Sequence, residues 1–237
     1  MKRLLVIGFF LSCSLNSFST CIAIYVAENG HIYVAADSRR TFFFNDKYKY
    51  ESVCKIHNVG ATYFAIAGID DAGLEAGAST ALQQNTNIDS AVKSFGTAMA
   101  KHYQKLMTDA RKYYPDKFKH FLNEGLADVS FFGFSNGEPY IIDMEFMVYL
   151  DDKKQVVATY RLNDVGSLNI IGISSDIRSE DRPSPEVIKQ NPELYVESLV
   201  KVEAKKHPQA VSEPIDLLEL SPDGPVWLRK NEYASVY

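Results

Sequence analysis

Four residues in the first quarter of the chain have the types needed to cleave an amide bond from a chain terminus. Thr20 and Cys21 carry nucleophilic side chains, and either would also hold a free α-amine if the chain were cut directly before it. Such an amine can act as the base for its own side chain. Lys55 and Asp37 supply an ammonium that lowers the pKa of the nucleophile and a carboxylate that orients the ammonium. These types predict covalent catalysis by the new terminus.

An oxyanion formed during such a reaction needs a fixed hydrogen-bond donor, and Gly68 is our candidate for it. Gly68 follows the apolar run Ala65-Ile66-Ala67 and offers a backbone N–H without side-chain bulk. Because a preorganised N–H donor stabilises developing negative charge, we expect the Gly68 amide to face the reacting carbonyl.

The first 19 residues have the order of a secretory leader. A basic start, Met1-Lys2-Arg3, precedes the apolar run 4–11 and a small, polar stretch in which Ser17 and Ser19 have the spacing that signal peptidase prefers. The apolar run is far shorter than the roughly 20 residues that cross a bilayer. We therefore expect residues 1–19 to be a signal peptide and 20–237 a single domain, exported to the periplasm or outside the cell. No later stretch predicts a membrane span.

The candidate nucleophiles begin a predicted β-hairpin that ends at Asp37. Residues 21–27 and 31–37 are rich in β-branched and apolar residues, and Asn29-Gly30 between them is a strong hairpin signal. Neighbouring residues on a strand point to opposite faces. Only one of Thr20 and Cys21 can therefore face Lys55.

Further strands and helices follow in groups. Residues 38–51 are polar and aromatic without a clean period, and 168–173 add a candidate edge strand. The other expected strands are 52–58, 61–67, 128–134, 138–144, 146–150, 156–162, 215–220 and 226–229, and the expected helices are 72–84, one capped by Asn87 or Asp89, and 192–206. Grouped strands and helices predict two sheets packed face to face with helices outside them.

The segments around Cys21 to Arg39, Val53-Cys54-Lys55-Ile56 and Ala65 to Asp71 resemble the proteasome β-subunit family of N-terminal nucleophile (Ntn) hydrolases, including the simpler bacterial proteasome-like peptidases. The resemblance implies an α+β fold, a four-layer αββα sandwich of two antiparallel sheets flanked by helices. It also implies that the nucleophile lies on the first strand, with Asp37 and Lys55 as the charge pair and Gly68 as the oxyanion donor.

The identity of the nucleophile stays open between two neighbours. The family's aspartate lies sixteen residues beyond its nucleophile, and 37 − 21 = 16 selects Cys21. Leader chemistry selects Thr20, because a cut after Ser19 follows a small residue. An exported free thiol would also risk oxidation, which favours Thr20.

The chain departs from the family at its supporting polar residues. The serine expected in the glycine loop falls at Ile173, with Ser174 adjacent, and the later Asp and Ser pair falls at Gln209 and Ser212. Gln209 can accept and donate hydrogen bonds but adds no negative charge. We include Ser174, Gln209 and Ser212 among the expected site residues.

Composition restricts the partners and cofactors. The 237 residues carry a formal net charge of −5 and scattered basic residues, which excludes an electrostatic footprint for nucleic acid. The five histidines show no metal-ligand spacing, so we expect neither metal nor cofactor. Three cysteines are too few for a disulfide scaffold, although Cys21 and Cys54 could pair.

The leading functional hypothesis is an exported peptidase or amidohydrolase of threonine or cysteine type, acting on a peptide or a small amide. The alternative is a non-catalytic structural subunit or binding module on the same scaffold; Asp37 and Lys55 favour the enzyme, whereas Ile173 and Gln209 favour the alternative. Because the family forms rings, a homo-oligomer is a further expectation.

Overall fold

The computed structural model describes residues 20–44, 47–69, 71–122, 125–174, 177 and 183–232. The predicted leader, residues 1–19, lies outside them. No helix in these ranges combines the length and the apolarity that crossing a bilayer requires.

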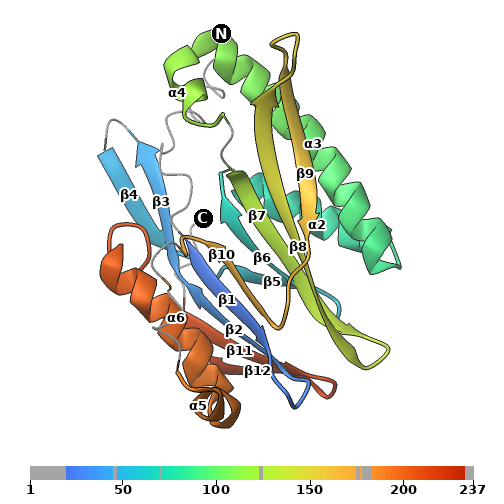
Figure 1. The fold of residues 1–237 in the computed structure, drawn as a ribbon, viewed down its shortest axis with the longest axis vertical. Helices are drawn as coiled ribbons and strands as arrows, with labels where there is room; N and C mark the ends of the chain where they lie inside the picture. Colours follow the sequence, from blue (N-terminus) through green and yellow to red (C-terminus); the bar gives the residue numbers. More distant parts are fainter. Residues whose placement is uncertain are drawn as a thin grey trace.

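The first sheet has five antiparallel strands in the order β10-β1-β2-β11-β12 (Figure 1). Its strands are β1 (Cys21–Val26), β2 (Ile32–Asp37), β10 (Leu168–Gly172), β11 (Ile215–Ser221) and β12 (Gly224–Arg229). The hairpin of β1 and β2 turns at Gly30, whose φ of 80° lies in the left-handed region that glycine adopts without strain. The hairpin predicted from Asn29-Gly30 is confirmed, and the predicted strands 215–220 and 226–229 are present as β11 and β12.

The second sheet runs β5-β6-β7-β8-β9, again antiparallel throughout. Its strands are β5 (Ile56–Val59), β6 (Thr62–Gly68), β7 (Gly125–Ser135), β8 (Glu138–Leu150) and β9 (Val156–Asn163). The two segments predicted as 138–144 and 146–150 are one strand, β8, because Glu145 alternates in direction with its buried neighbours Met144 and Phe146.

A separate two-stranded ribbon, β3 (Arg39–Phe44) with β4 (Lys47–Ser52), stands beside the sheets (Figure 1). Residues 38–51, polar and aromatic without a clean period, predict no strand, so this ribbon is a difference from expectation. The ribbon joins the end of β2 to the segment that carries Lys55, so it starts and ends next to the predicted charge pair.

Strands that follow one another in the chain are divided between the two sheets in two places. The hairpin of β1 and β2 and the hairpin of β5 and β6 lie in different sheets, and the predicted edge strand 168–173 pairs with β1 rather than with β7 to β9. Sequence periodicity identifies a strand, but its neighbour in a sheet is chosen by burial of whole faces, which local pattern does not encode.

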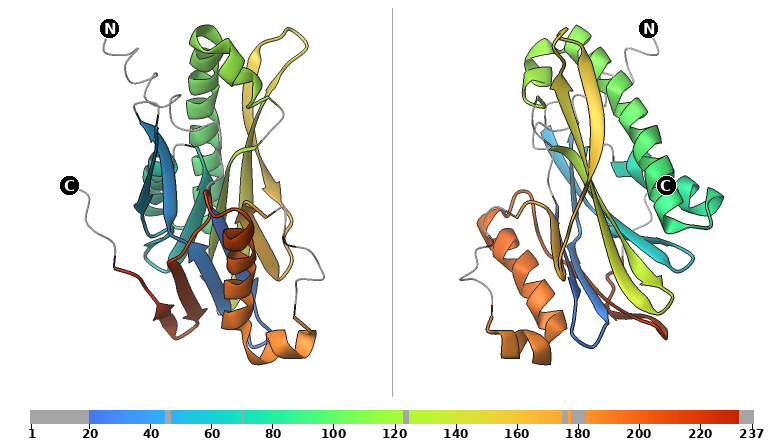
Figure 2. Two further views of the ribbon diagram at one scale, coloured as in Figure 1. Left: turned by 90° about the vertical axis from the view of Figure 1, so that its left-hand side faces the viewer. Right: turned by 45° about the vertical axis from the view of Figure 1, so that its right-hand side comes forward.

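Helices cover one face of each sheet. Helix α2 (Asp71–Gln84) and the long α3 (Ile88–Tyr113) pack on the second sheet, and α6 (Pro192–Lys206) packs on β1, β2 and β11 of the first. Two short helices, α4 (Pro115–Lys119) and α5 (Pro185–Gln190), follow α3 and precede α6. The right-hand view of Figure 2 shows α3 and α6 on opposite sides of the strands.

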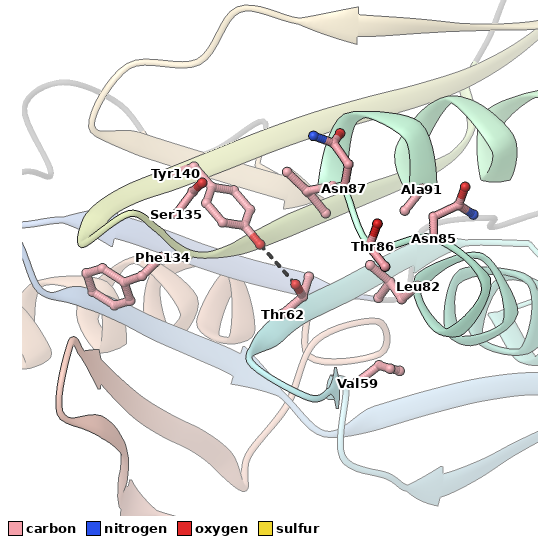
Figure 3. Close-up of a pocket in the computed structure, with 11 residues that line it drawn as sticks. Val59, Thr62, Leu82, Asn85, Thr86, Asn87, Ala91, Phe134, Ser135 and Tyr140 are labelled. Atoms are coloured by element: carbon pink, nitrogen blue, oxygen red, sulfur yellow. Dashed lines mark hydrogen bonds between the residues drawn. The ribbon is translucent and has the colours of Figure 1, made fainter.

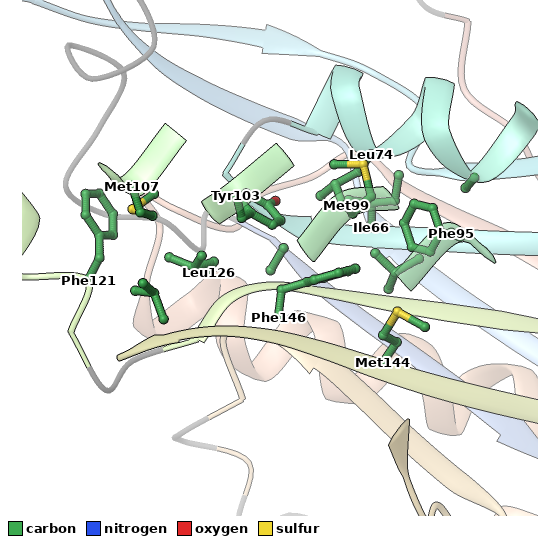
Figure 4. Packing of buried hydrophobic residues seen from close by; sticks show 14 of the residues in the cluster. Ile66, Leu74, Phe95, Met99, Tyr103, Met107, Phe121, Leu126, Met144 and Phe146 are labelled. Carbon is green, nitrogen blue, oxygen red and sulfur yellow. The ribbon is translucent and has the colours of Figure 1, made fainter. Parts of the chain in front are cut away.

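Of the two caps predicted for α3, Asn87 and Asp89, the structure shows Asn87. The side chain of Asn87 accepts a hydrogen bond from the Ser90 N–H, which satisfies one of the otherwise unpaired donors of the first turn. The helix buries Phe95, Met99 and Tyr103 against the sheet, where they pack with Phe146 and other apolar side chains (Figure 4).

Strand alternation divides the remaining core in two. Ile22, Ile24 and Val34 point into a cluster between the sheets that includes Ala65 and Phe132. Their neighbours Cys21, Ala23 and Ala35 point the other way, into a cluster with α6. Both faces of β1 are therefore buried, and the residue that precedes the strand is fixed in direction.

Candidate active site

Thr20, Lys55 and Asp37 form a buried, hydrogen-bonded row. The Lys55 Nζ donates to Thr20 Oγ1 at 2.7 Å and to Asp37 Oδ1 at 2.9 Å. Thr20 is 7% exposed, Lys55 6% and Asp37 0%, so the ion pair is screened little by solvent. A buried ammonium this close to a hydroxyl lowers the cost of removing the hydroxyl proton.

The Asp37 carboxylate is surrounded by donors. Besides Lys55, Oδ1 accepts the Cys21 N–H at 2.8 Å and Oδ2 accepts the Arg39 N–H at 3.0 Å. Burial raises the pKa of the Asp37 carboxyl, while the Lys55 ammonium and the two N–H donors act in the opposite direction. Because every contact to its oxygens comes from a donor, the arrangement fits an ionised carboxylate paired with Lys55.

These three residues come from both sheets. Thr20 precedes β1 and Asp37 ends β2 in the first sheet, whereas Lys55 directly precedes β5 in the second. The Lys55 side chain thus crosses between the sheets at the end of their shared core. The row exists only where the two sheets are packed together.

Cys21 faces away from this row. Its side chain is 0% exposed and belongs to the apolar cluster between β1 and α6. Burial, followed by the negative charges of Asp37 and Glu203, raises the pKa of the Cys21 thiol. The prediction that only one of Thr20 and Cys21 faces Lys55 is confirmed, and the one that does is Thr20.

Cys54, which could have formed a disulfide with Cys21, is not bonded to it. Cys21 and Cys54 are both free cysteines, and the Cys54 thiol donates to the Ile56 carbonyl at 3.2 Å. No disulfide joins them in the structure.

The backbone of Thr20 is held by β10. The Ile173 N–H donates to the Thr20 carbonyl at 2.8 Å, and Gly172, with a φ of 85°, pairs with Cys21. A Cβ at Gly172 would lie 2.1 Å from the Thr20 carbonyl oxygen. Only glycine permits this approach, so Gly172 sets how deeply Thr20 lies in the site.

Gly68 lies at the end of β6, next to the site but pressed against β7. Its φ is 140°, and an added Cβ would lie 2.4 Å from the Ala127 Cα. The preceding Ala67 has its Cβ 3.2 Å from the position of a Cβ on Gly172. Glycine is thus required at both positions by close approach of another strand.

The three supporting residues predicted from the family lie in two loops, one after β10 and one before β11. Ser174 is half-buried, and its carbonyl accepts the Ile177 N–H. Gln209 is exposed and accepts from the Tyr50 hydroxyl at 3.2 Å, and Ser212 is half-buried in the loop before β11.

One cluster beside the site was missed by the sequence analysis. The Arg39 guanidinium lies 4.8 Å from the centroid of the Tyr50 ring and donates to the Pro208 carbonyl, and Tyr50 in turn bonds to Gln209. These contacts tie the β3–β4 ribbon to the loop that follows α6. The Lys-Tyr-Lys-Tyr alternation in residues 47–50 was a signal for this strand.

A second group that the sequence pattern did not predict lies where β7 and β8 of the second sheet meet β10 of the first. Asn169 of β10 donates to Ser130 Oγ at 2.6 Å and to Asp143 Oδ1 at 3.0 Å, and Ser130 donates to Asp143 at 2.7 Å. On the same face, Asp128 Oδ2 lies 3.5 Å from the Gly172 nitrogen, which donates to it. The period-two spacing of Asp128 and Ser130 was the available signal.

A cavity of about 220 Å³ lies elsewhere, lined by Thr62, Tyr140 and the junction of α2 and α3 (Figure 3). The Thr62 and Tyr140 hydroxyls are 3.1 Å apart. Thr62 is at the opposite end of β6 from Ala67, roughly 17 Å along the strand at about 3.3 Å per residue. This cavity is therefore not part of the Thr20 site.

In the described ranges, no three His, Cys, Asp or Glu side chains are grouped as ligands for a metal ion. The absence of a metal stays a prediction.

Comparison with solved structures gives distant likenesses. No family model and no curated protein matches the sequence. Among solved structures, the chain is similar to a Gly-1 mutant of Anbu from Hyphomicrobium sp. strain MC1, with 15% identity and a TM-score of 0.48. The match covers 91% of this chain and 88% of that one.

Proposed function

We propose that this protein is an exported amide hydrolase of proteasome-like fold, with Thr20 as its nucleophile once residues 1–19 are removed. The observation that carries the proposal is the 2.7 Å hydrogen bond from Lys55 Nζ to Thr20 Oγ1, with Asp37 bound to the same ammonium at 2.9 Å. A charged lysine is seldom buried unless it is paired. Here the Lys55 ammonium is paired with Asp37 and also donates a hydrogen bond to the Thr20 hydroxyl.

In the proposed reaction, the Thr20 Oγ1 attacks the carbonyl carbon of the substrate amide and its proton passes to the Thr20 α-amine. The C–N bond then breaks, and the α-amine returns that proton to the leaving nitrogen. Water attacks the resulting ester by the same route, and the carboxylic acid and the free hydroxyl are released. Lys55 stabilises the developing alkoxide, and the Gly68 N–H is proposed as the oxyanion donor.

Thr20 is preferred to Cys21 on three grounds. The hydroxyl contacts Lys55, the thiol lies on the opposite face of β1, and burial raises the pKa of the thiol, which leaves it a poor nucleophile. The interval of sixteen residues that favoured Cys21 corresponds instead to a backbone contact, the Cys21 N–H to Asp37.

The fold is proposed to be the four-layer αββα sandwich expected for Ntn hydrolases. Three apolar clusters support this. One lies between the two sheets, a second joins α2 and α3 to the outer face of the second sheet, and a third joins α6 to the outer face of the first sheet. The substrate class stays a peptide or a small amide. The roles of Ser174, Gln209 and Ser212, export and homo-oligomerisation stay predictions.

One observation favours the non-catalytic alternative. At the position where the family carries a serine beside the terminal amine, Ile173 packs its side chain against the apolar cluster at α6. It offers no hydroxyl to the amine. A protein that keeps the scaffold but not the reaction would have this feature.

Intact mass of the protein as it is exported is the first test. We expect a chain that begins at Thr20. Incubation with a β-lactone should then add the full mass of the probe, because the Thr20 hydroxyl opens the ring by acylation without a leaving group.

Three variants locate the reaction. Thr20→Ala and Lys55→Ala should abolish acylation while the far-ultraviolet circular dichroism is retained, whereas Cys21→Ala should remain acylated. Lys119→Ala is the matched control, since the exposed Lys119 side chain forms a salt bridge with the exposed Asp116 and lies outside the row. A mature terminus at Thr20 with no acylation would contradict the hydrolase proposal and favour the non-catalytic alternative.

A further inference from the structure

We propose that the Asp128 carboxylate positions the Thr20 carbonyl through the turn formed by Gly172 and Ile173. Asp128 does not touch the substrate in this proposal, so it is a positioning residue. The inference deepens the proposed function and rests on it for its catalytic meaning, but its structural step can be tested without activity.

The path from Asp128 to Thr20 has two hydrogen bonds. The Gly172 N–H donates to Asp128 Oδ2 at 3.5 Å, and the next amide, that of Ile173, donates to the Thr20 carbonyl at 2.8 Å. The peptide planes on either side of Gly172 share its two dihedral angles. A change in the direction of the Gly172 N–H therefore rotates the neighbouring Ile173 amide, whose N–H donates to the Thr20 carbonyl.

Strand β10 belongs to the first sheet, and its Asn169 side chain also fixes it to the second sheet. Any movement of the backbone is therefore confined to the last residues of the strand. Asn169, 7% exposed, bonds to Ser130 and Asp143, which are 0% and 5% exposed. The Asn163 side chain holds the other oxygen of Asp143 at 2.7 Å. Three residues after Asn169, the Gly172 contact is the longest in this group at 3.5 Å, so it is the weakest of them.

The charge of Asp128 is controlled by its neighbours on each adjoining strand. Burial raises the pKa of the Asp128 carboxyl to about 7, and the negative charges of Asp143 and Glu145 on β8 add to the rise. The Gly172 N–H on β10 and the Arg161 guanidinium on β9 lower it. Across β6 the paired residue is Ala67, which carries no charge.

Ionisation of Asp128 therefore takes place near neutral pH. An ionised carboxylate accepts an N–H more strongly than a protonated carboxyl does. Above pH 7 the Gly172 amide is held in place, and below it that hold is weakened. The site thus becomes better ordered as the pH rises through 7.

The structural step is tested by nuclear magnetic resonance of the purified protein between pH 5 and pH 9. We expect the amide signals of Gly172 and Ile173 to shift with a common midpoint near 7, and Asp128→Asn to abolish that shift. Glu145→Gln is the matched control: it removes a charge that raises the pKa of Asp128, so the midpoint should move to lower pH. Amide signals that do not titrate, or that titrate equally in Asp128→Asn, would overturn the proposal.

The catalytic step is tested by the rate of β-lactone acylation in the same pH range. The ratio of the wild-type rate to the Asp128→Asn rate cancels the titration of the Thr20 amine, which both proteins share. We expect this ratio to be near one at pH 5.5 and to rise about five-fold above pH 8, the difference between a charged and a neutral acceptor. A flat ratio contradicts the positioning role even if the amides titrate. If wild-type protein is not acylated at all, the hydrolase fails, and the amide titration alone decides whether Asp128 positions the turn.

Discussion

The Asn169 side chain reaches from one sheet to the other and donates to the Ser130 hydroxyl at 2.6 Å. Asn169 belongs to β10 and Ser130 to β7, so this contact and its extension to Asp143 form a polar tie between the two sheets. Because all three groups are buried, loss of one partner leaves the others short of a hydrogen bond.

Removal of this tie should lower stability more than its single bonds suggest. We expect Asn169→Ala to reduce the free energy of unfolding by about 1–3 kcal/mol in urea titrations. A double-mutant cycle with Ser130→Ala should give a coupling energy of about 1 kcal/mol. Asn58→Ala is the control, since that exposed side chain bonds only locally to Gly60. Additive effects of the Asn169 and Ser130 changes would show that the two residues act separately.

Gly172 should not tolerate a side chain. In Gly172→Ala the new Cβ would meet the Thr20 carbonyl oxygen, so we expect loss of acylation and a drop in the free energy of unfolding well above 1 kcal/mol. Gly137 has nearly the same φ, 84°, with nothing within 4 Å of a Cβ. Gly137→Ala therefore measures backbone strain alone, about 1 kcal/mol. Equal costs at the two positions, measured by chemical denaturation, would contradict the close contact.

Replacement of Asp128 should stabilise the protein in a pH-dependent way. The pKa of the Asp128 carboxyl is about 7 in the folded protein and 3.8 when the group is free in solution, so between these values the folded chain keeps a proton that the unfolded chain has lost. Wild-type stability therefore loses a contribution as the pH rises from 4 to 7.

Asp128→Asn lacks this loss. We expect it to equal wild type near pH 4 and to exceed it by about 2–4 kcal/mol at pH 8 in urea denaturation. A positioning residue that lowers stability is typical of functional sites. If the variant were less stable than wild type at pH 8, the carboxylate would be serving the fold and not the site.

The two candidate nucleophiles should respond differently to conservative changes. Thr20→Ser keeps the hydroxyl on Lys55, so acylation by the β-lactone should fall by no more than about ten-fold, whereas Thr20→Ala removes it. Cys21→Ala removes a buried side chain from the cluster at α6, so it should cost about 1 kcal/mol in stability and leave acylation. Mass spectrometry of peptides from the acylated protein identifies the modified residue, and modification at Cys21 would refute the assignment.

Much of the chain's local structure could be predicted because the signals were short-range. Asn29-Gly30 set the first hairpin, Asn87 capped α3, and residues 192–206 form α6 as the helical pattern indicated. The division of strands between two sheets could not be predicted, because β1 and β5 differ in their partners and not in their local pattern.

The candidate site was predicted in its residue types and left open in one position. The sequence identified Asp37 and Lys55 and limited the nucleophile to one of two neighbours, since alternation allows only one to face the lysine. The choice depends on which face of β1 packs on the second sheet, which is a tertiary property. Asp128 was missed because its effect requires β10, more than 40 residues away in the chain and adjacent in space, as their contact across 44 positions shows.

Lys55 enters the site from the second sheet, while Thr20 and Asp37 belong to the first. In the proposed hydrolase, a chain that is still threading through a translocation pore has the hydroxyl and the ammonium on segments that have not yet met. The Thr20 hydroxyl is therefore not activated until the two sheets pack together. In that proposal, packing of the two sheets and activation of the Thr20 hydroxyl by Lys55 are a single event.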